Sequence, residues 1–301
     1  MKFFYYAHHG FPLPSHHRFP QEKYTLLQKR LEEYEDFPNL EMIPAPEATE
    51  DQLRLAHSAE YIAQIRDGTL PPKLEREMGL PWSPELAKRV RHTVGATIMA
   101  GRTALDEGIA CTGGGGTHHA QWDRPQGYCL FNDAIICSRI LQQERLVSEV
   151  LIIDCDVHQG NGTALIADDD PSIFTFSIHC EKNFPVRKAK SDLDIGLPIE
   201  TGDKIYLNAL KAGIDHILDS FSPEFVIYLA GADPFMGDRL GKLNLTMDGL
   251  KARDEYILDI CIKNRWPTVV TLAGGYGRDI NETVNVYFQT VKIAGMKQAQ
   301  F

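Results

Sequence analysis

The chain has 301 residues, of which 41 are acidic and 31 are Lys or Arg, so its formal net charge is −10. This balance argues against a nucleic-acid-binding protein that works through bulk positive charge. The composition, 43% hydrophobic and 24% charged, is typical of a globular protein rather than a disordered one. No apolar run approaches the roughly 20 residues that a membrane-spanning helix needs. We therefore expect neither a membrane nor a nucleic acid as a direct partner.

Short strands and longer helices alternate along the chain. The apolar N-terminus, residues 1–6, predicts a first strand that stops at His8 and His9. Helical spacing follows at residues 21–34, 84–105, 133–146, 204–218, 247–264 and 279–294. Runs of β-branched and aromatic residues predict strands at 150–153, 173–178, 225–229 and 268–272. This order predicts an α/β fold of three layers, with a central, mostly parallel sheet covered by helices on both faces.

No repeat, low-complexity tract or linker divides the sequence, so we expect residues 1–301 to form a single domain. The six cysteines include no C-x-x-C pair, which predicts neither a disulfide framework nor a cysteine-based zinc site. With no recognisable export signal, a cytoplasmic location is expected. The sequence gives no basis for predicting the oligomeric state.

Residues suited to metal binding follow two of the predicted strands. Asp156 and His158 are two positions apart after residues 150–153, so in extended backbone both side chains face the same way. Asp233 follows residues 225–229 and is a candidate third ligand, because ligands of α/β sheets bind at the carboxyl ends of strands. Two carboxylates and one imidazole suit Zn²⁺ with an open position for water, although Fe²⁺, Mn²⁺ and Co²⁺ also fit. Asp154 is either a fourth ligand or a residue that orients a histidine.

Four glycines, residues 113–116, precede Thr117, His118 and His119. Glycines let the backbone approach another group closely or adopt positive φ, and imidazole titrates near neutral pH. We therefore expect His118 and His119 to transfer protons rather than to form a structural pair. Histidines 8, 9, 16 and 17 lie in loop segments, where a solvated or hydrogen-bonded role is expected.

These segments together resemble the zinc-dependent histone deacetylase family, within the arginase/deacetylase fold. The matching sequences are GGTHHA (115–120), GYCLFND (127–133), DCDVHQGNG (154–162), GADP (231–234) and GGY (274–276). They occur in the family's order across roughly two thirds of the chain. The HRFP sequence at 17–20, with Lys23 and Tyr24 beyond it, is most similar to the compact class IV branch and to bacterial histone deacetylase-like amidohydrolases.

The resemblance implies a role for each matching residue. The zinc ligands correspond to Asp156, His158 and Asp233. The general acid/base pair corresponds to His118 and His119, and Asp154 corresponds to the carboxylate that orients His118. Tyr276 corresponds to the hydroxyl that binds the substrate carbonyl. Gly127, Tyr128 and Phe184 would line the tunnel for the acyl-lysine stem. A structural K⁺ would be bound by Asp154, Asp156, His158, Ser177 and Ile178. Arg18 either reaches an internal exit channel, as in relatives, or lies exposed.

Two positions depart from relatives in informative ways. Asn161 stands where class I enzymes have an Asp beside the second histidine, so the basicity of His119 should be lower. Tyr128 stands where Phe is usual in the tunnel wall. The ureohydrolases of the same fold add carboxylates that bind a second metal, whereas this chain has Gly160 and Gly231 there. A one-metal amidohydrolase is therefore favoured over an arginase-like enzyme.

The implied function is a zinc-dependent deacylase that hydrolyses N-ε-acyl-lysine, acetyl or longer, in proteins or peptides. An amidohydrolase acting on acetylpolyamines or other small acyl-amines is the alternative, because it would share the catalytic residues. A non-catalytic acyl-lysine binder is disfavoured, because the ligand triad, both histidines and Tyr276 are all present.

Overall fold

The computed structural model describes residues 1–7, 10–35, 37 and 39–301. Its strands form one eight-stranded sheet in the order β2-β1-β3-β8-β7-β4-β5-β6, and every neighbouring pair is parallel. The strands are β1 (Lys2–Tyr5), β2 (Glu41–Pro44), β3 (Ile109–Thr112), β4 (Val150–Asp154), β5 (Ile173–Cys180), β6 (Leu193–Leu197), β7 (Phe225–Leu229) and β8 (Thr268–Thr271). The predicted α/β class with a parallel sheet is confirmed.

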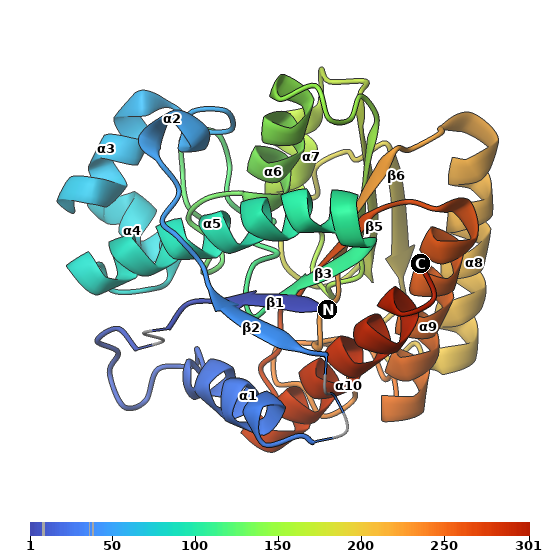
Figure 1. Cartoon of the computed structure of the whole chain (residues 1–301). Helices are drawn as coiled ribbons and strands as arrows, with labels where there is room; N and C mark the ends of the chain where they lie inside the picture. The colour runs from blue at the N-terminus through green and yellow to red at the C-terminus, as the bar shows by residue number, and fades with distance from the viewer. Residues whose placement is uncertain (8–9, 36, 38) are drawn as a thin grey trace.

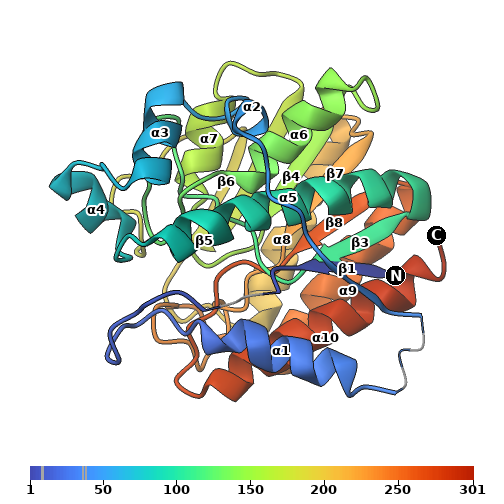
Figure 2. The ribbon, with the colours of Figure 1, turned by 60° about the vertical axis from the view of Figure 1, so that its left-hand side comes forward.

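Helices cover both faces of the sheet (Figures 1 and 2), which completes the predicted three layers. On one face lie α2 (Glu50–Leu53), α3 (Ala59–Asp67), α4 (Pro72–Met78), α5 (Pro84–Glu107), α6 (Asp133–Gln143) and α7 (Asn161–Ala167). On the other lie α1 (Glu22–Glu32), α8 (Asp203–Ser220), α9 (Met247–Asn264) and α10 (Ile280–Gln298). In the part of the chain that the structure describes, no helix is both long and apolar enough to cross a bilayer.

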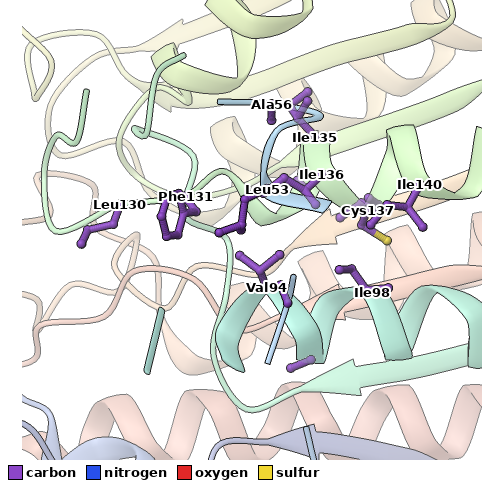
Figure 3. Packing of buried hydrophobic residues seen from close by; sticks show 14 of the residues in the cluster. Leu53, Ala56, Val94, Ile98, Leu130, Phe131, Ile135, Ile136, Cys137 and Ile140 are labelled. Carbon is purple, nitrogen blue, oxygen red and sulfur yellow. The ribbon is translucent and has the colours of Figure 1, made fainter. Parts of the chain in front are cut away.

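The core consists of two hydrophobic layers, one on each face of the sheet. Successive residues of β4 alternate between them, with Val150 and Ile152 in the layer under α5 and α6, and Leu151 and Ile153 in the layer under α8 to α10. Figure 3 shows how Val94 and Ile98 of α5 pack toward α6 in the first layer. Burial on both faces explains why the strands are almost continuously apolar.

Capping residues fix several helix ends at the positions that the sequence indicates. Ser83 accepts a hydrogen bond from the backbone N–H of Leu86 at the start of α5, and Pro84 occupies the first turn. Gly108, with a φ of 88°, ends the same helix, and β3 begins at the next residue. Because all strands run the same way, the loops that follow β3, β4, β7 and β8 meet at one edge of the sheet.

Candidate metal centre and active site

Asp156, His158 and Asp233 lie together at the carboxyl edge of the sheet. One potential ligand atom from each lies within 4.8 Å of the others, and all three side chains are buried. Nδ1 of His158 is 3.0 Å from Oδ1 of Asp156 and 3.3 Å from Oδ2 of Asp233. The first two residues follow β4 and the third follows β7, two strands that are neighbours in the sheet.

Backbone donors hold the outer oxygens of the two carboxylates. Oδ1 of Asp233 accepts a hydrogen bond from Val157 N at 2.9 Å, and Oδ2 of Asp156 accepts one from Gly274 N at 2.7 Å. Oδ2 of Asp233 is buried and receives no hydrogen bond. A buried carboxylate oxygen without a donor is costly, and a cation between the three residues would satisfy it. The donor set of two carboxylates and one imidazole fits zinc.

Two glycines lie so close to the Asp156 and Asp233 side chains that no larger residue fits in their place. A Cβ at Gly274 would lie 1.9 Å from Oδ2 of Asp233. A Cβ at Gly231 would lie 2.7 Å from the Cα of Asp156, so a carboxylate at position 231 would not fit this backbone. Position 231 therefore contributes no ligand atom to the cluster.

The two carboxylates of the cluster have pKa values that move in opposite directions. Burial and the nearby charge of Asp156 raise the pKa of Asp233. Burial also opposes ionisation of Asp156, but the charges of His118 and His158 and the hydrogen bonds from His158 outweigh it and lower the pKa of Asp156. Such opposed shifts are typical of carboxylates packed together in a functional site.

His118 is paired with the carboxylate of Asp154. Nδ1 of His118 donates to Oδ2 of Asp154 at 2.6 Å, and the other oxygen of Asp154 accepts the backbone N–H of Asp156 at 3.0 Å. Burial lowers the pKa of His118, but the charges of Asp154 and Asp156 and the hydrogen bond outweigh it and raise the pKa to about 9. Of the two roles considered for Asp154, this contact matches the one that orients a histidine.

His119 has a neutral partner instead. Its Nδ1 donates to Oδ1 of Asn161 at 2.7 Å, and Nδ2 of Asn161 donates to Oε1 of Gln126 at 2.7 Å. Burial, followed by repulsion from His118 and His158, lowers the pKa of His119 well below its usual value. The two rings of the histidine pair lie 4.0 Å apart, so one is held beside a carboxylate and the other beside an amide.

Tyr276 follows β8 and lines the same cavity as Asp156 and His158 of the metal cluster. Its backbone N–H donates to Oδ2 of Asp238 at 2.5 Å, and Asp238 also accepts the N–H groups of Leu240 and Gly241 at 2.8 Å each. Burial raises the pKa of the Tyr276 phenol, which stays protonated. A protonated hydroxyl can donate a hydrogen bond to an oxyanion in the cavity.

A cavity of about 370 Å³ connects these groups with the surface. Gly127, Tyr128 and Phe184 all line it, and the ring of Phe184 lies 4.9 Å from that of His119. Tyr128 has a φ of 69°, a conformation that non-glycine residues rarely adopt and that occurs often at functional sites. The preceding Gly127 is required, because a Cβ there would lie 2.7 Å from the ring of His119.

The remaining predicted residues are placed as follows. Asp154 and Ser177 are paired in register on β4 and β5, and Ile178 follows Ser177. The five residues assigned to K⁺ therefore occupy neighbouring strands and the loop after β4.

Arg18 is exposed, which matches the alternative that it lies at the surface rather than in an internal exit channel. His16 is exposed and His17 contacts Gly79 O at 2.9 Å, while His8 and His9 lie outside the described residues.

Sequence reasoning missed several residues that support the site. Asp238 holds the Tyr276 loop, and Asp133 accepts the backbone N–H groups of Gly116 and Thr117. Arg253, fully buried on α9, donates to the carbonyl of Gly231 at 2.6 Å. Asp133 lies within the GYCLFND sequence at the start of a helix, and this position is a signal from which a supporting role could have been inferred. Asp238 and Arg253 have no distinctive spacing from the residues they hold.

The sequence profile of the histone deacetylase domain matches residues 17–291, which is most of the chain. The chain belongs to the histone deacetylase family. It is accordingly a hydrolase of the deacetylase type, and proteins of this fold family generally use a catalytic metal. The cluster of Asp156, His158 and Asp233 provides a site where a metal fits.

Relatives of known sequence include proteins from bacteria and a plant. An uncharacterised protein of Picosynechococcus sp. is 42% identical over 281 residues, which cover 93% of each chain. Histone deacetylase 2 of Arabidopsis thaliana is 28% identical over 263 residues, covering 84% of this chain and 68% of the plant protein. An acetoin utilization protein, AcuC, of Staphylococcus aureus is 31% identical over 225 residues, covering 67% of this chain and 58% of the relative.

Two solved structures share the fold at low sequence identity. The HD domain of HDA15 superposes with a TM-score of 0.80 at 22% identity, covering 99% of this chain and 94% of that domain. A histone deacetylase homologue complexed with SAHA superposes with a TM-score of 0.83, also at 22% identity, covering 98% of this chain and 84% of the other. These similarities confirm the arginase/deacetylase-like architecture expected from the sequence.

Proposed function

We propose that this protein is a metal-dependent deacylase that hydrolyses N-ε-acyl-lysine in proteins or peptides to free lysine and a carboxylate. The observation that carries the proposal is the convergence of Asp156, His158 and Asp233 on one point, with a buried Asp233 oxygen that lacks a donor. The two histidines and Tyr276 line the same cavity. We further propose that residues 1–301 act as one catalytic domain of class IV type.

Asp156, His158 and Asp233 would hold the metal, which we propose to be Zn²⁺, with Fe²⁺ as the second choice. A bound ion of this kind polarises the amide carbonyl and lowers the pKa of water. Backbone donors from Val157 and Gly274 fix the two carboxylates from outside, so their inner oxygens are directed to a common centre. We also propose a structural K⁺ at Asp154, Asp156, His158, Ser177 and Ile178.

The hydrogen bonds of the histidine pair support a division of labour. Because His119 donates its Nδ1–H to Asn161, its Nε2 has a free lone pair and can accept a proton from the attacking water. Because His118 is hydrogen-bonded to the carboxylate of Asp154, it can remain an imidazolium that stabilises negative charge or returns a proton to the leaving amine. Tyr276 would donate a hydrogen bond to the developing oxyanion.

The cavity wall supports a substrate with a long, slender stem. Phe184 and Tyr128 present aromatic surface on the way to the metal cluster, and the lysine side chain has an apolar stem of four methylene groups. Gly127 brings the wall within contact distance of the His119 ring, so a stem held there would place its amide beside the acid/base pair.

An assay with three substrates tests the proposal against the alternative of small acyl-amines. An acetyl-lysine peptide, a longer acyl-lysine peptide and N-acetylputrescine are compared at equal concentration, with and without a chelator. We expect chelator-sensitive hydrolysis of a peptide and a lower kcat/KM for N-acetylputrescine. Faster turnover of N-acetylputrescine than of either peptide would favour the polyamine alternative, and no turnover of any substrate after metal loading would contradict a deacylase function.

A further inference from the structure

Two buried cations line the cavity beside Tyr276. Lys23 of α1 and Arg89 of α5 both contribute to its wall, and they are only 1% and 8% exposed. Neither belongs to the proposed metal cluster or to the acid/base pair. A cation removed from water is costly unless a counter-charge or a full set of acceptors accompanies it. The groups that contact Lys23 and Arg89 therefore indicate which kind of ligand the inner part of the cavity binds.

The described residues place no carboxylate counter-charge beside either cation. Within residues 1–7, 10–35, 37 and 39–301, no carboxylate lies within 4.0 Å of Lys23 or Arg89. Lys23 donates to the carbonyl of Gly275 at 2.9 Å and to the hydroxyl of Tyr287 at 3.0 Å. Nη1 of Arg89 is buried and has no hydrogen-bond partner. The guanidinium thus has a donor that is shielded from water but has no acceptor.

Aromatic rings surround the Arg89 guanidinium, and the Tyr24 side chain also hydrogen-bonds to it, but Nη1 stays without a partner. Its Cζ lies 4.5 Å from the ring centroid of Tyr24, 5.2 Å from that of Phe11 and 5.6 Å from that of Phe19. Nζ of Lys23 lies 5.1 Å and 5.7 Å from the rings of Tyr24 and Phe19. Cation–π contacts stabilise the charges, but they provide no acceptor for the Nη1 donor of Arg89. The two cations therefore flank the same pair of rings and create a positive, largely apolar enclosure.

This enclosure is connected to the proposed reaction centre. One cavity is lined by Arg89, Lys23, Tyr276 and two residues of the metal cluster, Asp156 and His158. The ring of Phe19 lies 6.5 Å from that of Tyr276. The cavity volume of about 370 Å³ includes both the part beside Tyr128 and Phe184 and the part beside Lys23 and Arg89, so the substrate stem and the acyl group share it. An uncharged acyl chain would leave the Arg89 guanidinium without a counter-charge, whereas an anionic group at its far end would supply one.

We infer that the enzyme prefers acyl groups that end in a carboxylate, such as succinyl- or glutaryl-lysine, and that Arg89 binds this carboxylate. The inference rests on the proposed deacylase function and specifies its substrate class. In the reaction, water adds to the amide carbonyl, the C–N bond breaks and the lysine nitrogen takes a proton. The products are lysine and a dicarboxylate, so no co-reactant is needed.

Matched pairs of peptides test the preference. Glutaryl-lysine is compared with pentanoyl-lysine, and succinyl-lysine with butyryl-lysine, because each pair has the same number of carbons and differs in the terminal carboxylate. We expect kcat/KM to be about 10- to 100-fold higher for one of the carboxylated peptides than for its neutral partner, which is the worth of one charge-assisted hydrogen bond to a buried group. Arg89→Met should remove this ratio, and Arg89→Lys should retain part of it.

Arg102→Met is the control, because Arg102 lies on the same helix but pairs with Glu144 at the surface. It should leave the ratio unchanged. Thermal unfolding and metal content of each variant establish that Arg89→Met is folded and loaded. If Arg89→Met does not fold, the ratio in Arg89→Lys and in wild type decides the matter.

A binding measurement separates this inference from the deacylase proposal. Calorimetric titration of the metal-loaded protein with glutarate and with pentanoate should give tighter binding of glutarate, by about tenfold, in wild type but not in Arg89→Met. Hydrolysis of neutral acyl peptides with no carboxylate preference would overturn the inference and leave the deacylase function standing. Equal losses on acetyl and glutaryl peptides in Arg89→Met would also overturn it. If no peptide is hydrolysed, the deacylase function fails, while the glutarate titration still tests Arg89.

Discussion

His119 donates its Nδ1–H to Oδ1 of Asn161 across 2.7 Å, so a neutral amide holds the histidine that faces Phe184 in the cavity. Gln126 accepts from the other end of the amide and fixes which atom of Asn161 points at the ring. The neighbouring His118 instead lies against the carboxylate of Asp154. Two adjacent residues thus acquire different proton affinities from their partners, which is a way to separate a base from an acid.

Asn161→Asp should raise the pKa of His119, because a carboxylate stabilises the imidazolium that an amide does not. Catalysis by neutral His119 is lost as the pH falls through this pKa. A higher pKa therefore moves the acidic limb of the kcat/KM profile to higher pH, by about one to three units. The measurement is kcat/KM against pH on an acyl-lysine peptide. Asn208→Asp, at an exposed position of α8, controls for the added charge, and an unshifted limb in Asn161→Asp would refute the proposed role.

Tyr276→Phe should lower kcat by about 10²- to 10³-fold, the usual cost of losing one oxyanion donor. The metal ligands and the Asp238 contact to the backbone of residue 276 remain, so metal content and the melting temperature should not change. Steady-state kinetics and elemental analysis on the same preparation measure both quantities. Tyr256→Phe, at a partly buried position of α9 that does not line the cavity, is the matched control. Wild-type turnover in Tyr276→Phe would remove the hydroxyl from the mechanism.

Asp233→Ala should lose the metal, because it removes the inner carboxylate oxygen that has no donor of its own. Binding to the native state alone stabilises a protein by about 2.7 kcal/mol at a ligand concentration of 100 times Kd. A chelator should therefore lower the melting temperature of wild type and of Asp215→Ala, an exposed control on α8, but not that of Asp233→Ala. Full zinc occupancy in purified Asp233→Ala would show that the ligand assignment is wrong.

The elements that the sequence predicted well are those with strong local signals. The bounds of α9 agree with the expectation, because Thr246 caps its start and Arg265, in the left-handed region, ends it. β7 agrees for a different reason, since its five residues are apolar on both faces and polar groups follow at once. The loops after β4, β7 and β8 then carry their side chains to one edge, as parallel strands require.

The strands that the sequence did not reveal have weaker patterns. β2 is an edge strand of four residues with no buried member, and β6, the other edge, alternates partly buried and exposed residues around Gly196. β3 is fully buried but short, and it follows α5 with a single glycine between them. Periodicity over four or five residues does not distinguish such strands from loops.

The contacts that support the site were hidden for another reason. Lys23 is separated by more than 250 positions from Gly275, whose carbonyl it holds, and Asp238 is 38 positions from the Tyr276 N–H that it accepts. Such pairs depend on how the layers pack, which no local spacing records. The ligand cluster was visible because a D-x-H spacing and a second strand end each carry a signal of their own.

His57 should make the protein less stable below neutral pH. It is fully buried, its Nδ1 donates to Gln121 O at 2.8 Å, and its Nε2 accepts the backbone N–H of Asn132 at 2.8 Å. Only the neutral ring can make both bonds, and burial lowers its pKa from 6.5 to about 4. The unfolded chain therefore binds this proton at a higher pH than the folded protein does. Stability is complete above about pH 6.5 and is lost as the pH falls toward 4.

The loss expected from this one group is on the order of 3 kcal/mol between these limits. Urea unfolding at several pH values measures it in wild type and in His57→Gln, which has no group that titrates in this range. His57→Gln should be less stable than wild type at pH 7, because one of the two hydrogen bonds is weakened, but its stability should fall less on acidification. His216→Gln, at an exposed position of α8, should follow wild type. Parallel pH curves for wild type and His57→Gln would mean that the acid sensitivity comes from other groups.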